Sequence, residues 1–86
     1  SNGHIPQEVI LSLTPYQGKY IKSLPLHESQ QILIDNEKEL RVKLTLFVTY
    51  DFFMELLSYG ENVKVIEPQN LISDIKKSLK ATLKQY

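Results

Sequence analysis

The chain has 86 residues, of which 42% are hydrophobic and 23% are charged, a composition typical of one small globular domain. Ten Lys and Arg residues balance ten Asp and Glu residues, and cysteine is absent. The zero net charge argues against an autonomous DNA-binding domain, and the absence of cysteine excludes disulfides, thiolate zinc sites and cysteine nucleophiles.

The sequence predicts a single domain over residues 5–86, preceded by a tag remnant or a disordered end at residues 1–4. Because the chain lacks an initiator Met, we expect it to be a fragment of a longer protein. No apolar run approaches the roughly 18–20 residues of a membrane span, and no secretory signal precedes the domain. We therefore expect a cytoplasmic protein without membrane contact.

The first half of the chain predicts a strand, a helix and a second strand. Residues 9–13 alternate with a period of two and contain β-branched side chains, a pattern typical of a strand. Thr14 and Pro15 then match the N-cap and first position of a helix that extends to about Ser23. Residues 30–34 predict the second strand.

The second half predicts a hairpin, two helices and a fourth strand. A polar turn at residues 35–38 leads into residues 40–48, where five apolar side chains alternate and indicate a long strand. Thr49 can cap a second helix, and Gly60 fits the position after its end. A short strand at residues 63–66 precedes the last helix, whose expected apolar face is Leu71, Ile72, Ile75, Leu79 and Leu83.

This order of elements predicts an α+β fold. The first six elements form the ferredoxin-like βαββαβ arrangement, a four-stranded antiparallel sheet with two helices on one face, and the last helix is an addition. The other, open face should mix cations with large apolar residues: Ile10, Ser12, Leu33, Arg41, Lys43, Thr45, Phe47, Lys64 and Ile66. Two interpretations stay open: the last helix folds back over part of this face, or the face contacts another domain or a second copy.

No combination of residues in the sequence favours catalysis or a metal centre. His4 lies in the predicted disordered end, and His27 is a direct neighbour of Glu28 in a loop with Ser29. Adjacent loop residues seldom converge on one atom, and one usable histidine does not make a metal site. Arg41 lies within a strand and not in an anion-binding loop, which argues against an acylphosphatase. We expect no enzymatic activity and no cofactor.

A stripe of lysines on the last helix leaves two interpretations open. Lys76, Lys80 and Lys84 lie on one side of the helix, where they can form a solvated face near the helix C-terminus or contact phosphates of a nucleic acid. Sheets that recognise RNA carry stacked aromatic residues on their central strands, and only Phe47 would fit such a place. Direct RNA binding is therefore disfavoured.

Several segments, in order, resemble the C-terminal extension (WCX) domain of bacterial WYL-domain transcription regulators. The strand Val-Ile-Leu-Ser-Leu is followed by a tyrosine-bearing helix, and Leu26-His27-Glu28-Ser29-Gln30 matches a segment that enters a strand. Leu56-Leu57-Ser58-Tyr59-Gly60 and Val63-Lys64-Val65-Ile66-Glu67-Pro68 match two later motifs of the family. The resemblance covers nearly the whole chain.

The resemblance implies a regulatory and dimerisation module without catalytic residues, which also takes part in ligand sensing. Its partners would be the WYL and helix-turn-helix domains of the parent protein and a second subunit, with DNA bound only through the parent. A nucleic acid or a small anion is the implied ligand. The candidate ligand or partner contacts are Ile10, Arg41, Lys43, Phe47, Lys64 and Ile66. His27, Ser29 and Gln30 match a family motif, and either a ligand role or a loop-fixing role would explain them.

The alternative is a free-standing regulatory domain of the ACT type, which binds small molecules and has the same order of elements. Such a domain is expected to have a glycine-rich loop between its first strand and first helix. Residues 14–17 of this chain, Thr-Pro-Tyr-Gln, do not form such a loop. The sequence therefore favours the regulator module.

Overall fold

The computed structural model describes residues 5–86 and contains all seven predicted elements in the predicted order. The prediction of a tag remnant or disordered end at residues 1–4, which includes His4, lies outside the described residues. A single turn of 3-10 helix, η2 (Gly60–Asn62), follows the second helix. The elements are β1 (Gln7–Leu13), α1 (Pro15–Ser23), β2 (Gln31–Asp35), β3 (Leu40–Leu46), α2 (Tyr50–Ser58), β4 (Val63–Glu67) and α3 (Gln69–Leu83).

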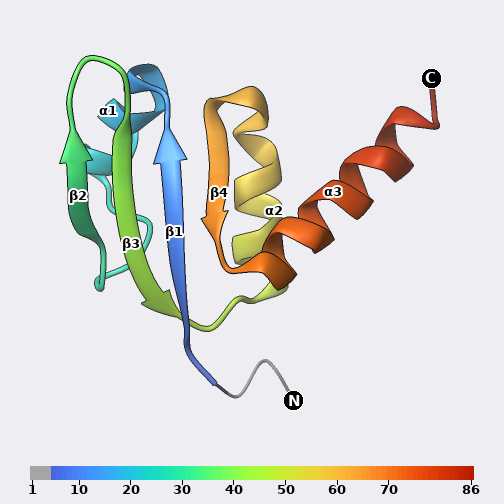
Figure 1. The fold of residues 1–86 in the computed structure, drawn as a ribbon, viewed down its shortest axis with the longest axis horizontal. Helices are drawn as coiled ribbons and strands as arrows, with labels where there is room; N and C mark the ends of the chain where they lie inside the picture. Colours follow the sequence, from blue (N-terminus) through green and yellow to red (C-terminus); the bar gives the residue numbers. More distant parts are fainter. Residues whose placement is uncertain (1–4) are drawn as a thin grey trace.

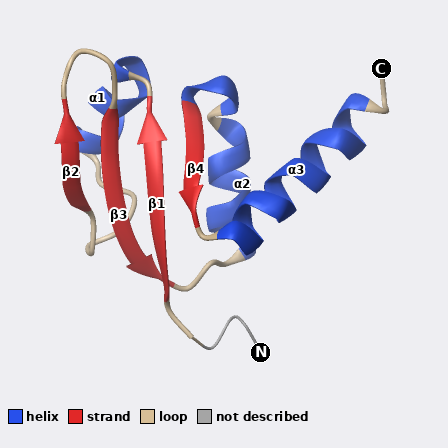
Figure 2. Cartoon of the chain, viewed as in Figure 1, coloured by secondary structure: helices blue, strands red, loops and turns tan. Residues whose placement is uncertain are grey.

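The four strands form one antiparallel sheet in the order β2-β3-β1-β4. On the central strand, Leu11 lies opposite Val42 of β3 and Val65 of β4. Helices α1 and α2 lie behind the strands in the view of Figures 1 and 2, so the sheet has one covered face and one open face. The predicted α+β architecture with a four-stranded antiparallel sheet is confirmed.

The core lies between the covered face of the sheet and the helices. The long apolar alternation of β3 and that of β1 both point into it, as the period of two requires. Among the described residues no polar or charged side chain is buried, so the core is held together by apolar packing alone. The buried side chains are Val9, Leu11, Leu13, Ile21, Leu40, Val42, Leu44, Leu46, Leu56 and Leu71.

The predicted helix boundaries are confirmed by their caps. The Oγ1 atom of Thr14 accepts a hydrogen bond from the backbone N–H of Gln17 at 3.3 Å, and Thr49 caps α2 in the same way through the N–H of Phe52 at 3.2 Å. Each bond satisfies a donor that has no partner within its helix. Gly60 has φ +58°, the left-handed conformation that glycine adopts at low cost after a helix.

The last helix differs from its prediction. Only Leu71 at its start is buried, whereas Leu79 is 53% exposed and Leu83 is 73% exposed. In Figure 1, α3 starts at the end of β4 and then runs away from the sheet. A helix of 15 residues is about 22 Å long, which is more than this small core can cover. The interpretation that the last helix folds back over the open face is therefore wrong.

Candidate functional site

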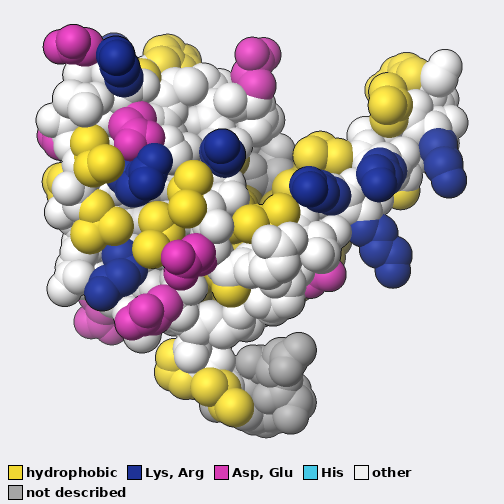
Figure 3. Space-filling model, viewed as in Figure 1, with side chains coloured by type: hydrophobic (Ala, Val, Ile, Leu, Met, Phe, Trp, Pro, Cys, Tyr) yellow, Lys and Arg dark blue, Asp and Glu magenta, His cyan; other side chains and the backbone are white. Residues whose placement is uncertain are grey.

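Side chains on the open face of the sheet form two rows that run across the strands. In the first row, Ser12 of β1 lies between Arg41 of β3 and Lys64 of β4. In the second row, Ile10 lies between Lys43 and Glu67. Figure 3 shows this face, with apolar side chains interleaved with charged ones. The structure thus brings Ile10, Arg41, Lys43 and Lys64 onto one surface.

Three carboxylates that the sequence reasoning missed lie on or beside the same face. Glu8 lies opposite Thr45 in the β1–β3 register, Glu67 lies opposite Ile10, and Glu39 contacts Ser12. The three cations of the face are therefore matched by three anions. Alternate residues of a strand point to the same face. Glu8 lies two positions before Ile10 and four before Ser12, so the sequence could have placed it on the open face. The expectation from the sequence placed cations but no carboxylates on this face. The structure shows that charges of both signs lie there in equal number.

Glu39 holds Arg41 in place. The Ser12 hydroxyl donates a 2.6 Å hydrogen bond to Glu39 Oε2, and Arg41 Nη2 lies 3.1 Å from Glu39 Oε1. The hydrogen bond from Ser12, with the nearby guanidinium of Arg41, lowers the pKa of Glu39 below its ordinary value. The guanidinium is thereby neutralised locally, so Lys43 and Lys64 are the cations of this face that form no ion pair among residues 5–86.

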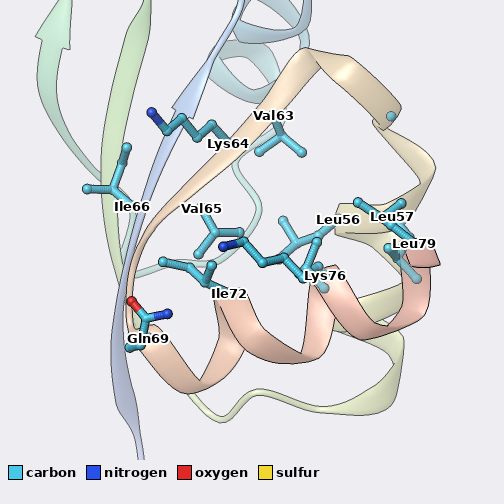
Figure 4. A pocket seen from close by; sticks show the side chains of 12 residues that line it. Leu56, Leu57, Val63, Lys64, Val65, Ile66, Gln69, Ile72, Lys76 and Leu79 are labelled. Atoms are coloured by element: carbon cyan, nitrogen blue, oxygen red, sulfur yellow. The ribbon is translucent and has the colours of Figure 1, made fainter. Parts of the chain in front are cut away.

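The other two candidate contacts lie at the margins of the face. Ile66 sits at a register shift between β1 and β4, and Figure 4 shows Lys64 and Ile66 pointing away from the side chains of Val63 and Val65. Phe47 follows the last residue of β3, because the strand ends at Leu46 and not at 48 as predicted. Phe47 is 47% exposed and lines a hollow of about 370 Å³ at the end of the sheet.

The segment His27–Gln30 fixes the connection between α1 and β2 and ties it to the sheet. Ser29 Oγ accepts the backbone N–H of Thr45 on β3 at 2.8 Å and lies 2.8 Å from His27 Nδ1. The N–H of Ser29 also donates to that Nδ1, so the network assigns the ring proton to Nε2. Gln30 Nε2 donates to the carbonyl of Ile21 at 2.9 Å.

This segment also borders the hollow that contains Phe47. His27 and Phe47 line it together with Phe52 at the start of α2. The structure therefore brings the family motif and one open-face candidate into the same place, a proximity that their 20-residue separation in the sequence did not show. The hydrogen bonds of Gln30 to Ile21 and of Ser29 to Thr45 hold this connection between α1 and the sheet.

Residues 5–86 contain no group of three or more His, Asp or Glu side chains that could hold a metal ion. They also contain no helix with the length and apolar character needed to cross a membrane.

Comparison with known proteins identifies one family. The model of the WCX domain matches residues 5–83, which is nearly the whole chain. A search of the curated proteins found no significant match. The matched range begins before β1 and ends at the last residue of α3, so it includes the sheet, its open face and all three helices.

Proposed function

The chain belongs to the WCX domain family, a family of regulator-associated C-terminal domains, and from this premise we propose that it is the C-terminal module of a WYL-type helix-turn-helix transcription regulator. In this role it acts without catalysis, in dimerisation and in the response to a ligand. The strand order β2-β3-β1-β4, with helices between β1 and β2 and between β3 and β4, supports the ferredoxin-like arrangement.

The observation that carries the proposal is the open sheet face. An antiparallel sheet with one solvated face usually shows polar residues there, yet this face combines apolar side chains such as Ile10 with three cations and three anions. A face with both charges is complementary to a protein partner, whose surface also carries charges of both signs. It is less complementary to a nucleic acid, whose backbone carries only negative phosphates. The proposed occupant is a WYL domain of the same or the partner subunit.

The proposed mechanism is a coupling between domain arrangement and ligand binding. A ligand that binds one arrangement of the WYL and WCX domains more tightly shifts the dimer toward that arrangement. The shift repositions the DNA-binding helices of the two subunits. Within the open face, Lys43 and Lys64 remain the cations best placed to contact a small anionic ligand at the domain boundary, since Arg41 is paired with Glu39.

The test is the substitution Phe47→Asp in the parent regulator. We expect the dimer dissociation constant to rise about tenfold or more, because a charge would be buried in an apolar contact, and the ligand response of DNA binding to weaken with it. Analytical ultracentrifugation and a DNA-binding titration measure these effects. Tyr50→Asp is the matched control, since Tyr50 is an exposed aromatic residue three positions away on α2.

An unchanged dimer and an unchanged ligand response in Phe47→Asp would overturn the assignment of this face. Circular dichroism of the variant establishes that its fold is intact. If both aromatic variants weaken the dimer equally, the effect belongs to α2 or to added negative charge and not to the proposed surface.

A further inference from the structure

A second surface is a groove of about 600 Å³ between α2, β4 and α3, which Lys64 and Ile66 of the open face also line. Figure 4 shows the side chains that line it, with those of α3 opposite those of α2 and β4. The lining is mainly aliphatic, and half-buried apolar groups in a concave site are typical of a binding site. The main apolar contributors are Leu56, Leu57, Val63, Val65, Ile72 and Ile75.

The charged residues of this groove are all of one sign. Lys64 and Lys76 line it, and no carboxylate does. In Figure 4 the side chain of Lys76 lies along the groove, and neither lysine forms an ion pair within the described residues. Lys80 follows one helical turn after Lys76 on α3. The groove is therefore complementary to an anionic occupant, in contrast to the charge-balanced open face.

The apolar lining continues beyond the groove along the projecting half of α3. Leu79 lines the groove and is 53% exposed, and Leu83 one turn later is 73% exposed. From Ile72 to Leu83 this stripe extends about 17 Å along the helix axis, about three turns. A small molecule in the groove would leave the projecting part of the stripe uncovered, whereas a second helix packed alongside α3 would cover it.

We propose that the groove and the projecting half of α3 bind an amphipathic helix of a partner protein, with the apolar side of that helix in the groove and its carboxylates facing Lys76 and Lys80. This is recognition of a helix in a groove, in which residues at positions i, i+3, i+4 and i+7 are the anchors. The inference goes beyond the proposed function, since its partner is a helix of another protein and its tests are made on α3, although the groove shares Lys64 and Ile66 of β4 with the open face.

A second copy of this chain fits the surface less well. Lys76, Lys80 and Lys84 border the apolar stripe on one side, because they follow one another at intervals of four residues. In an antiparallel pair of α3 helices these sides would meet along one seam, where their like charges repel. An acidic helix of another protein meets the same lysines with the opposite charge.

The experiment uses two labelled peptides of about 18 residues, long enough for helix formation on binding. Both carry Leu at i, i+3, i+4 and i+7; one carries Glu on the flanking positions and the other carries Lys. Fluorescence anisotropy against the 86-residue chain should show the Glu peptide binding at least about tenfold more tightly, with a gain of peptide helicity in circular dichroism.

Variants of the chain localise the binding. Leu79→Glu should weaken binding of the Glu peptide about tenfold or more. Leu24→Glu should not, since Leu24 is also an exposed leucine (79%, against 53% for Leu79) but lies at the end of α1. The double variant Lys76→Glu, Lys80→Glu should reverse the preference toward the Lys peptide. Phe47→Asp should leave peptide binding unchanged, which keeps this test separate from that of the open face.

Three results would overturn the proposal. Equal binding of both peptides, insensitive to Leu79→Glu, would remove the charge argument. A concentration-dependent dimer of the chain that Leu79→Glu abolishes would make a second copy the occupant. Binding of dodecanoate or of vesicles of phosphatidylglycerol, with no binding of either peptide, would assign the surface to a small amphipathic anion or to a lipid surface.

Discussion

The two faces of the sheet use the same strands for different purposes. On the covered face, neighbouring positions such as Leu11, Val42 and Leu44 are completely inaccessible to solvent. On the open face, the residues between them carry charges of both signs and stay partly exposed. Alternate residues of one strand therefore face the core and the exposed surface, so substitutions at adjacent positions can separate core stability from the proposed contact with partners.

The sharpest test of this comparison is a pair of alanine substitutions at adjacent residues of β1. Leu11→Ala should lower the free energy of unfolding by about 2–5 kcal/mol, because it removes a fully buried side chain and leaves a cavity. Ile10→Ala should cost about 1 kcal/mol, mostly through strand propensity. Urea denaturation measures both. Equal losses at the two positions would mean that the open face contributes to the core.

A smaller effect is expected where α1 packs on the covered face. A Cβ atom at Gly18 would lie 2.9 Å from the Cβ of Leu40, so Gly18→Ala must displace the helix from the sheet. Such overpacking costs about 1–3 kcal/mol, and the better helix propensity of Ala recovers about 1 kcal/mol of it. Thermal denaturation should show a net loss, whereas Lys19→Ala, on the exposed side of the same helix, should leave the melting temperature nearly unchanged.

The smallest effect is on the open face and depends on pH. The pKa of Glu39 is lowered in the fold by Ser12 and Arg41, so its ionised form stabilises the native state. This contribution is complete above the ordinary Glu pKa of about 4.3 and is lost as the pH falls through the lowered value. Glu39→Gln should therefore be less stable than the wild type at neutral pH, with a difference that shrinks in acid.

Denaturation curves at neutral pH and at successively lower pH values measure this difference. The matched control is Glu37→Gln in the exposed β2–β3 turn. A difference between Glu39→Gln and the wild type that stays constant into acid would show that the Ser12–Glu39–Arg41 contacts do not depend on the carboxylate charge.

Much of the fold could be predicted because its signals are local. The alternation of residues 40–48 and the caps at Thr14 and Thr49 depend on neighbours within a few residues. The structure confirms both caps and a strand over Leu40–Leu46. Functional sites are harder to predict from the sequence, since they bring together residues that are far apart along the chain. Arg41 pairs directly with Glu39 two positions away, but the hydrogen bond from the Ser12 hydroxyl on another strand to Glu39 needed the β1–β3 register, and no count of charges supplies a register.

The sequence by itself determined the number, type and order of the elements, because hydrophobic periodicity and capping act within one segment. The tertiary structure decided where α3 goes and how charge is distributed over the open face. An amphipathic pattern shows which side of α3 is apolar but not how much of it the core can accept, and Leu71 is buried whereas Leu83 is exposed. The small size of the core is the physical reason, since a domain of this length has little apolar surface left to cover a helix of 15 residues.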